Sequence, residues 1–565
     1  MSAGRASFEI QTFRNGHWST EEFRETESAG RACAKKLFSA TPPVQGVRVV
    51  KNWARADGQI TETVVFTQMR ESNPDQVRIV AIETANVCRQ PADYFSQASR
   101  MTIGRLLRNY LEQAVMTPTE LLHNYRALKR IQDTDSLYPS AVDRVATVQS
   151  RITGDDSRER RDELYRAVDQ MSVRALRAER MRSLPRLDDD FAKVVEEVSR
   201  FAEDDEDRDY YSLVVLSNDL ITTRNWLGKL ERLTRLSGKG LPPASMSLLD
   251  GVIADLLGVP SALQDVLGHQ RSLAAALIQM VDLSEGLAKT SPADSPQLEV
   301  LNGLFAAGLL PACRAALLDR VQRQLASAQP LDRAGPGSED QALRRVLARL
   351  VGPEGVCGGP DVAAALVLRF ARSLEQGGRT GQCIAIGGVL NMIRMPDVEV
   401  MFLVELLRAQ LGRDHGGDVL KLIHDTVHVR DLEKLVPAKL SPKDKMVRAT
   451  RLHRFLMASH LPEDMRQGLA DHIDDLLARY LLREGVIEKL DKPDSPLRQR
   501  AIMLVQFCAA GVLPEGKALK LARERVVSHL RRPDFEKEFV TGLDATAQAR
   551  SLRAFYSLLG RAGFH

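Results

Sequence analysis

Hydrophobic and polar positions alternate with a period of two at the start of this chain and with a helical period from about residue 91 onward. In the first region, strand-like runs surround two hairpin-turn signals, Asn15-Gly16 and Asp57-Gly58, and a helical run covers residues 25–40. The order ββαββ predicts a small, mostly antiparallel α+β module within residues 1–75. The apolar run 77–82 fits either an added edge strand or the start of the helical region, and the pattern leaves both open.

The helical period continues through the rest of the chain. Thr117-Pro118-Thr119-Glu120 is typical of a capped helix start, with proline at the first helical position and an acidic first turn. We therefore expect a helical domain over residues 90–285 and, after a boundary loop at 284–296, a helical-hairpin domain over 286–565. Within the first of these domains the pattern predicts helices over 91–115, 139–153, 157–183, 187–204, 208–236 and 245–257.

A sequence motif recurs with variations in the second half of the chain. Each copy opens with Ser-Pro and closes with Phe, several small residues and Leu-Pro. These are the parts of a helical hairpin: a serine cap, a proline at the first helical position, a helix-ending turn and a break before the second helix. Diverged copies fit residues 380–400 and 236–242. The openings and closings of the three clear copies are Ser295-Pro296 with Leu310-Pro311, Ser441-Pro442 with Leu461-Pro462, and Ser495-Pro496 with Leu513-Pro514.

The repeated motif predicts a mostly α chain, namely an irregular, α-solenoid-like array of helical hairpins preceded by the ββαββ module. Composition agrees, because 44% hydrophobic and 27% charged residues over 565 positions are typical of a globular chain of several folding units. The net charge of +4, from 78 basic and 74 acidic residues, gives no electrostatic footprint for nucleic acid.

Composition and spacing also bear on the compartment. The first residues lack the apolar segment of a secretory signal, and the longest apolar runs, such as 273–281, are far shorter than a membrane span. Six cysteines are scattered without a C-x-x-C pair, most of them among apolar neighbours. These features predict a cytoplasmic protein with reduced thiols and no membrane span.

The sharpest chemical signal is His424-Asp425-Thr426-Val427-His428. Two histidines at i and i+4 share one face of a helix, which is the spacing that two helical metal ligands need. His424-Asp425 also resembles the dyad of HD-domain phosphohydrolases, which are all-helical metal enzymes. That resemblance implies an earlier histidine and a later aspartate on neighbouring helices, whereas His415 is too close in sequence and His269 very distant. The competing interpretation is a polar helix face with two incidental histidines; a third ligand, if one exists, would come from His415, Asp418, His453 or His460.

A second candidate site lies in the N-terminal module. Its two tryptophans have basic neighbours, and RNA-binding sheets combine aromatic and basic side chains in this way. In so small a domain, alternating tryptophan and valine are more often the pattern of a core. The residues of this candidate binding site are Trp18, Arg48, Lys51, Trp53 and Arg55.

Taken together, the sequence predicts a non-enzymatic cytoplasmic adaptor, scaffold or regulatory protein that binds other proteins through a helical-repeat surface. No cofactor and no catalytic residue are predicted, nucleic acid is not the expected partner, and self-association stays open. One alternative is a helical metal-dependent hydrolase centred on His424, Asp425 and His428. Another is a nucleic-acid-associated regulator that uses the N-terminal sheet.

Overall fold

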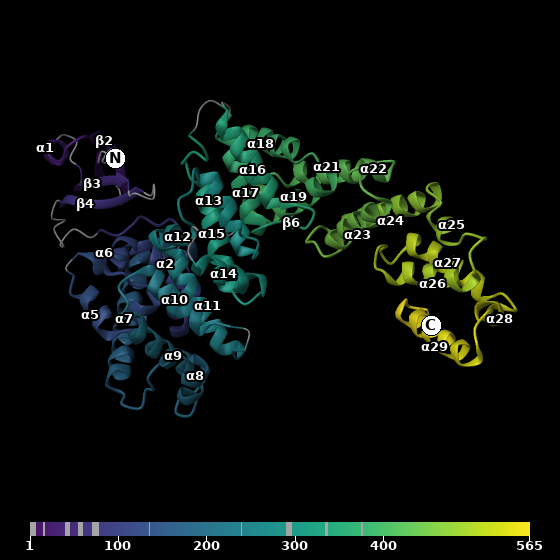
Figure 1. Ribbon diagram of the computed structural model, residues 1–565, viewed down its shortest axis with the longest axis horizontal. Helices are drawn as coiled ribbons and strands as arrows, with labels where there is room; N and C mark the ends of the chain where they lie inside the picture. The colour runs from purple at the N-terminus through teal and green to yellow at the C-terminus, as the bar shows by residue number, and fades with distance from the viewer. Residues whose placement is uncertain are drawn as a thin grey trace. The chain divides into compact units, whose positions relative to one another are not determined.

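The structure is a computed structural model that describes residues 7–14, 17–39, 44, 46–54, 60–69, 78–134, 136–238, 240–289, 296–333, 337–374 and 377–564. It is mostly helical and begins with a four-stranded sheet, which confirms the predicted fold class (Figure 1). The chain forms two compact units that interleave in sequence. Unit 1 holds residues 1–87, 105–114 and 125–174, and unit 2 holds residues 88–104, 115–124 and 175–565.

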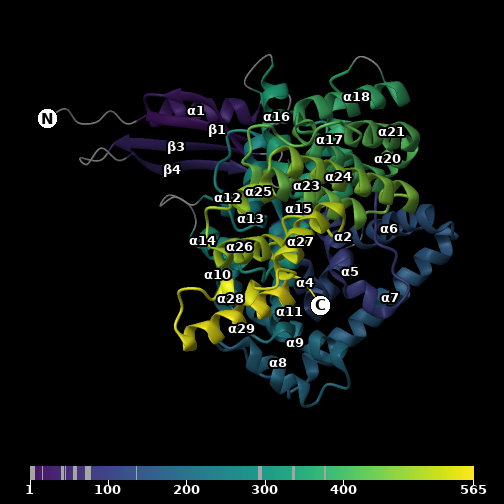
Figure 2. The same ribbon diagram turned by 90° about the vertical axis from the view of Figure 1, so that its right-hand side faces the viewer.

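The N-terminal module of unit 1 has the predicted ββαββ order. Its elements are β1 (Ser7–Arg14), β2 (His17–Arg24), α1 (Glu27–Phe38), β3 (Gly46–Ala54) and β4 (Ile60–Met69). The strands pair antiparallel in the order β2-β1-β3-β4, with Ile10 opposite Val49. Alternation along β1 and β3 places Phe8, Ile10 and Val49 on one face, where they form a small core with Ala34 of α1. Figure 2 shows α1 alongside this sheet.

The segment after the sheet takes neither of the two predicted forms, because residues 78–90 form no helix and no strand. Its backbone is satisfied by other partners. Val80 N donates to Leu106 O at 2.8 Å, Asn109 Nδ2 donates to Arg78 O at 3.2 Å, and the side chain of Arg144 donates to the carbonyl of Ile82. An apolar run can therefore lie outside helices and strands when a carbonyl at a helix end and side chains supply its hydrogen bonds.

Two predicted helices are broken in the structure. The helix expected over 91–115 becomes a 3₁₀ turn and two helices; Ser96, whose backbone is extended (ψ 155°), separates the turn from α2. The helix expected over 208–236 divides where Asn225 caps a new start by accepting from Gly228 N at 2.6 Å. The elements between the sheet and residue 290 are the 3₁₀ turn Pro91–Phe95, α2 (Gln97–Leu106), α3 (Arg108–Ala114), α4 (Pro118–His123), α5 (Tyr125–Gln132), α6 (Leu137–Thr153), α7 (Ser157–Arg180), α8 (Phe191–Ser199), α9 (Asp205–Leu220), α10 (Trp226–Leu236), α11 (Pro243–Gly258), α12 (Pro260–Leu267) and α13 (Leu273–Ser284).

The second half of unit 2 consists of consecutive helices, several of them paired as hairpins; α23 with α24 and α26 with α27 are clear examples (Figure 1). The elements are α14 (Pro296–Ala306), α15 (Pro311–Ala326), α16 (Ser338–Leu350), the two-residue strands β5 (Val351–Gly352) and β6 (Gly355–Val356), α17 (Gly359–Ala371), α18 (Gly378–Ile393), α19 (Pro396–Arg408), α20 (Gln410–Asp414), α21 (Gly416–Val427), α22 (Leu432–Leu435), α23 (Pro442–Met457), α24 (Glu463–Arg483), α25 (Val486–Leu490), α26 (Leu497–Ala509), α27 (Lys517–Leu530), α28 (Phe535–Phe539) and α29 (Ala545–Arg561).

The residues of the repeated motif begin and end helices in ways that differ between its copies. Ser441 caps α23 by accepting from Asp444 N at 3.2 Å, whereas α26 begins after Pro496 without a side-chain cap, and Ser295 lies outside the described residues. The small residues end the first helix of the hairpin. Gly308 and Gly511 adopt φ of +70° and +65°, the left-handed conformation that a glycine accepts without steric cost.

Buried aspartates of one helix cap the first turn of another. Asp250 of α11 accepts from Ala312 N at 2.6 Å and Cys313 N at 2.9 Å, the first free amides of α15. Asp474 of α24 does the same for α27, accepting from Lys517 N and, at 3.1 Å, from Ala518 N. We call these contacts cross-helix caps. They satisfy helix-start donors that no local side chain serves, and they tie helices about 40 to 60 residues apart in the sequence.

Packing in unit 2 follows chain order. From α15 onward, and within the described residues, each extensively contacting pair of helices lies within four positions in the element order, such as α15 with α17, α17 with α19, and α24 with α27. One continuous hydrophobic core nevertheless runs from Ala178 to Ala562. No single described helix is long and apolar enough to cross a membrane; two consecutive pairs pass that test only jointly, α11–α12 bent by 94° and α14–α15 by 108°.

Candidate functional site

The candidate binding residues of the N-terminal sheet do not gather on one face. Alternation along β3 places Arg48 on the face opposite α1 and Lys51 on the face that carries α1. The guanidinium of Arg48 lies 4.5 Å from the ring centroid of Trp18, and its Nε donates to Gln11 Oε1 at 2.6 Å. Arg48 thus covers part of the tryptophan ring that a base would use for stacking.

The structure gives no side-chain geometry for the other two residues of this candidate site, Trp53 and Arg55. The backbone of Trp53 belongs to β3, but its side chain is outside the described part of the structure, and Arg55 lies outside the described residues altogether. Nucleic-acid binding by this sheet therefore stays a prediction.

The two histidines of the predicted metal site lie at the end of α21, with their rings stacked. The ring centroids of His424 and His428 are 3.8 Å apart at an interplanar angle of 19°, and His472 of α24 stacks on His428 at 4.6 Å. His428 is the C-cap of α21, and its Nδ1 donates to the carbonyl oxygen of His424 at 3.0 Å. Asp425 Oδ1 lies 3.3 Å from His424 Nδ1, with both side chains exposed.

Stacking of this kind does not bring ring nitrogens to a common point. A metal lies in the plane of each imidazole that binds it, about 2.0–2.1 Å from the nitrogen, so two nearly parallel stacked rings cannot share one ion without a ring turning. Metal binding by His424, Asp425 and His428 stays a prediction that requires such a turn.

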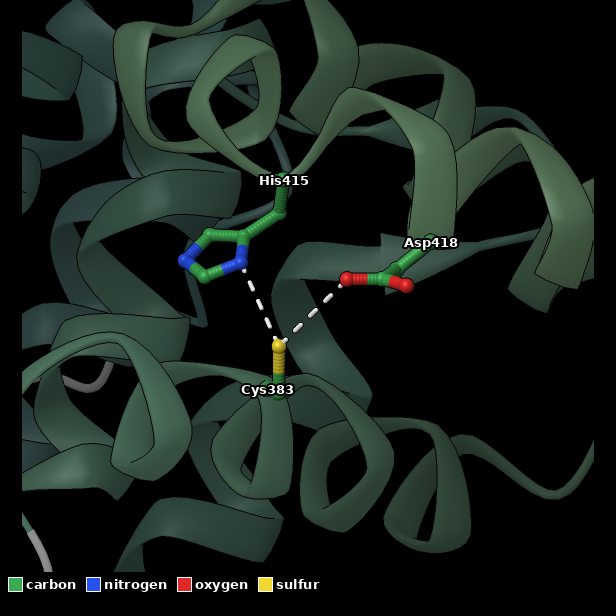
Figure 3. A group of neighbouring side chains, drawn as sticks. All are labelled: Cys383, His415 and Asp418. Atoms are coloured by element: carbon green, nitrogen blue, oxygen red, sulfur yellow. Dashed lines mark hydrogen bonds between the residues drawn. The ribbon is translucent and has the colours of Figure 1, made fainter.

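A different set of side chains converges at α18 and the start of α21 (Figure 3). The Sγ atom of Cys383 lies 3.2 Å from Nδ1 of His415 and 3.7 Å from Oδ2 of Asp418. All three ligand atoms lie within 4.8 Å of one another. His415 is buried, Cys383 is half-buried, and Asp418 is exposed, so the cluster reaches from the protein interior to solvent. We call Cys383, His415 and Asp418 the thiol cluster.

The local fold explains how the thiol cluster is positioned. His415 is the single residue between α20 and α21, and Asp418 occupies the first turn of α21, where a helix favours an acidic side chain. Helix α20 can approach the end of α19 because residue 412 is glycine; an added Cβ would lie 1.9 Å from the carbonyl oxygen of Leu406. Arg379 of α18 donates to the carbonyl oxygen of Asp414 at 2.9 Å, which fixes the α20–α21 turn beside α18.

Hydrogen bonding fixes the orientation of the buried imidazole. The Nε2 atom of His415 lies 2.8 Å from Oε1 of Gln382, the residue next to Cys383 on α18. An amide oxygen only accepts, so Nε2 carries the proton and Nδ1 presents its lone pair to the thiol. Burial raises the pKa of Cys383, the Asp418 carboxylate raises it further, and Arg379 opposes both, so the thiol keeps its proton at neutral pH.

Sequence reasoning identified two of the three members of this cluster. His415 and Asp418 are two of the four candidates for a third ligand beside His424 and His428, and in the structure they lie beside Cys383 instead. The sequence does not single out Cys383 among the six scattered cysteines. It lies 32 residues before His415, on a different helix, and no spacing rule links the two positions.

Comparisons of this chain with protein-family models, with curated proteins and with solved structures each find no match.

Proposed function

We propose that this protein is a non-enzymatic cytoplasmic adaptor, scaffold or regulatory protein that binds other proteins along the helical array of residues 286–565. The observation that carries the proposal is the packing order of unit 2, in which helices contact near neighbours in the chain. An array of this kind gains lateral surface with every added hairpin, and such surfaces are used to bind extended or large partners.

The exposed side chains of the array support the proposal. Several large apolar side chains are exposed, each on a different helix of the array: Val300, Ile384, Leu422, Met457, Leu482 and Tyr556. Each alone is ordinary for a soluble surface. Their spread along the array favours a partner that contacts several hairpins over a ligand held in one pocket.

A reducing compartment is part of the same proposal. None of the six cysteines, all of which lie in the described part of the chain, forms a disulfide, and burial raises the pKa of Cys357 and of Cys508 to about 11, which keeps both thiols protonated. Protonated, partly buried thiols are poor nucleophiles for disulfide exchange, as suits a structural role in the cytoplasm.

Cross-linking in cells tests the proposal. The tagged full-length chain would be cross-linked in its native host, the captured proteins identified, and the cross-linked residues mapped by mass spectrometry. We expect a reproducible partner whose cross-links lie on several helices within 286–565. Two matched variants replace an exposed apolar side chain by an acid, Leu482→Glu on α24 of the array and Val173→Glu on α7 of unit 1.

The variants and the map together decide the outcome. Loss of the partner with Leu482→Glu but not with Val173→Glu would add one contact residue to the map. Cross-links confined to residues 7–174, or no reproducible partner at all, would refute binding through the array. Cross-links between two copies of the chain at the N-terminal sheet would instead indicate self-association.

A further inference from the structure

We propose that Cys383, His415 and Asp418 bind one Zn²⁺ ion, with a water molecule as the fourth ligand. This inference is independent of the proposed protein-binding function.

The separations between the three side chains are close to those of a tetrahedral zinc site. With Zn–S of about 2.3 Å, Zn–N of about 2.0–2.1 Å and Zn–O of about 2.0–2.2 Å, tetrahedral angles place sulfur about 3.6 Å from both the nitrogen and the oxygen. The observed separations from Cys383 Sγ are 3.2 Å to His415 Nδ1 and 3.7 Å to Asp418 Oδ2. The exposed Asp418 carboxylate can adjust the remaining nitrogen–oxygen separation by a side-chain rotation.

The buried imidazole is oriented as a metal ligand requires. His415 is 1% exposed, and Gln382 accepts a hydrogen bond from its Nε2, which leaves the lone pair on Nδ1. Figure 3 shows this Nδ1 atom facing Cys383. Metal-bound histidines commonly have their second nitrogen fixed by an oxygen acceptor, and Gln382 provides one here. Because Gln382 and Cys383 are consecutive on α18, one helix both orients the imidazole and supplies the sulfur.

The mixed donor set favours zinc over other common ions. Magnesium and calcium prefer oxygen ligands alone, whereas sulfur, imidazole and carboxylate together suit a borderline ion such as Zn²⁺. Binding converts the thiol to a thiolate, and the displaced proton passes to bulk water. The thiolate and the carboxylate then carry two negative charges that balance the two positive charges of the ion. Three protein ligands leave a fourth position, which the exposed side of the cluster opens to water.

The main competing interpretation is a nucleophilic cysteine activated by His415. In such a site a carboxylate or amide orients the imidazole, as Gln382 does here, and the thiol faces the base alone. Here Asp418 faces the sulfur as well, a position that a residue orienting the imidazole would not take. The same carboxylate is well placed as a ligand, so the arrangement favours a metal over a nucleophile.

Metal analysis of the full-length protein tests the proposal. Protein kept reduced would be stripped with a chelator, dialysed against ZnCl₂ and then against buffer, and its zinc measured by mass spectrometry. Competition with a chromophoric chelator gives the affinity, and CoCl₂ in place of zinc gives the absorption of a cobalt–thiolate bond. We expect one zinc per chain and a cobalt–thiolate band.

Single substitutions identify which residues bind the ion. Asp418→Asn removes an exposed ligand and spares the core, and Cys383→Ser removes the sulfur; we expect each to weaken zinc affinity at least about 100-fold and Cys383→Ser to abolish the cobalt–thiolate band. Gln382→Ala leaves all three ligands and should weaken binding by about 10–100-fold. Cys357→Ser, at another half-buried cysteine beside a carboxylate, is the matched control and should leave binding unchanged.

The double variant His424→Ala/His428→Ala separates this site from the stacked histidines. Zinc that persists in this double variant and is lost in Asp418→Asn supports the thiol cluster. Zinc that persists in Cys383→Ser and Asp418→Asn but is lost in the double variant overturns the proposal in favour of the histidine pair. Protein that retains no zinc after dialysis overturns it outright.

Discussion

Removing the Asp250 carboxylate should destabilise α15 much more than removing an ordinary helix cap destabilises its helix. Asp250 is 2% exposed, and its two oxygens accept from Ala312 N and Cys313 N at 2.6 and 2.9 Å. In Asp250→Ala both amides lose their acceptor, and the space that the carboxyl group fills between α11 and α15 is left empty.

The magnitude follows from these two hydrogen bonds. A hydrogen bond to a charged group contributes about 1.5–3 kcal/mol, and a buried donor left without a partner costs about 1–3 kcal/mol. Since the two bonds share one carboxylate and are not additive, we expect about 3–5 kcal/mol for Asp250→Ala. Asp250→Asn keeps one acceptor oxygen and should cost about 1–3 kcal/mol.

Hydrogen exchange read by mass spectrometry measures this effect locally. A loss of about 3 kcal/mol corresponds to an increase of more than about 100-fold in the exchange rate of amides that exchange through opening of α15. Peptides covering 311–326 would be compared between the wild type and Asp250→Ala, and whole-chain stability followed by thermal denaturation.

Asp204→Ala is the matched control. Asp204 is exposed and caps its own helix, α9, by accepting from Asp207 N at 2.8 Å, so its loss should have the effect of an ordinary N-cap, about 1 kcal/mol. If Asp250→Ala increases exchange in 311–326 no more than Asp204→Ala increases it in 205–220, the cross-helix cap does not stabilise α15 as the distances indicate.

Three further predictions test other parts of the structure. Lys229→Met leaves Glu120 buried without its cation and should lower the free energy of unfolding by about 3–5 kcal/mol, whereas adding Glu120→Gln should restore part of it; urea denaturation of both variants checks this. Gly412→Ala, whose Cβ would lie 1.9 Å from a backbone oxygen, should cost about 1–3 kcal/mol, while Gly468→Ala, which has open space, should be neutral or stabilising in the same thermal melts. Burial lowers the pKa of His453 below its ordinary value of 6.5, so the unfolded chain binds this proton more readily and stability should fall as pH drops below about 6.5. His453→Leu should reduce that dependence, and an unchanged slope of melting temperature against pH would contradict the assignment.

The sequence allowed the sheet and most helix positions to be predicted, because alternation and helical period reflect which face is buried. The broken helices show the limit of that reasoning. Ser96 and Asn225 begin new helices inside continuous apolar patterns, since a local side chain or an extended residue can restart a helix without changing the period.

Tertiary contacts explain what the sequence could not reveal. The pairing of Asp250 with the start of α15 spans 62 residues, and the meeting of Cys383 with His415 spans 32, so neither follows from spacing. In contrast, His424 and His428 drew attention because their spacing is a known ligand pattern, yet that pattern fixes only the face of the helix. It does not determine the rotation of the rings, which stack in the structure.

The cross-helix caps also constrain how such an array can change over evolutionary time. A simple repeat can gain or lose one hairpin by duplication or deletion, because each unit carries its own helix signals. Here the carboxylate that begins α15 belongs to α11, and the one that begins α27 belongs to α24. Deleting a hairpin that holds either the capping carboxylate or the capped helix would leave the other without its partner. Cut points for chimaeras must therefore keep the two helices of each cross-helix cap together.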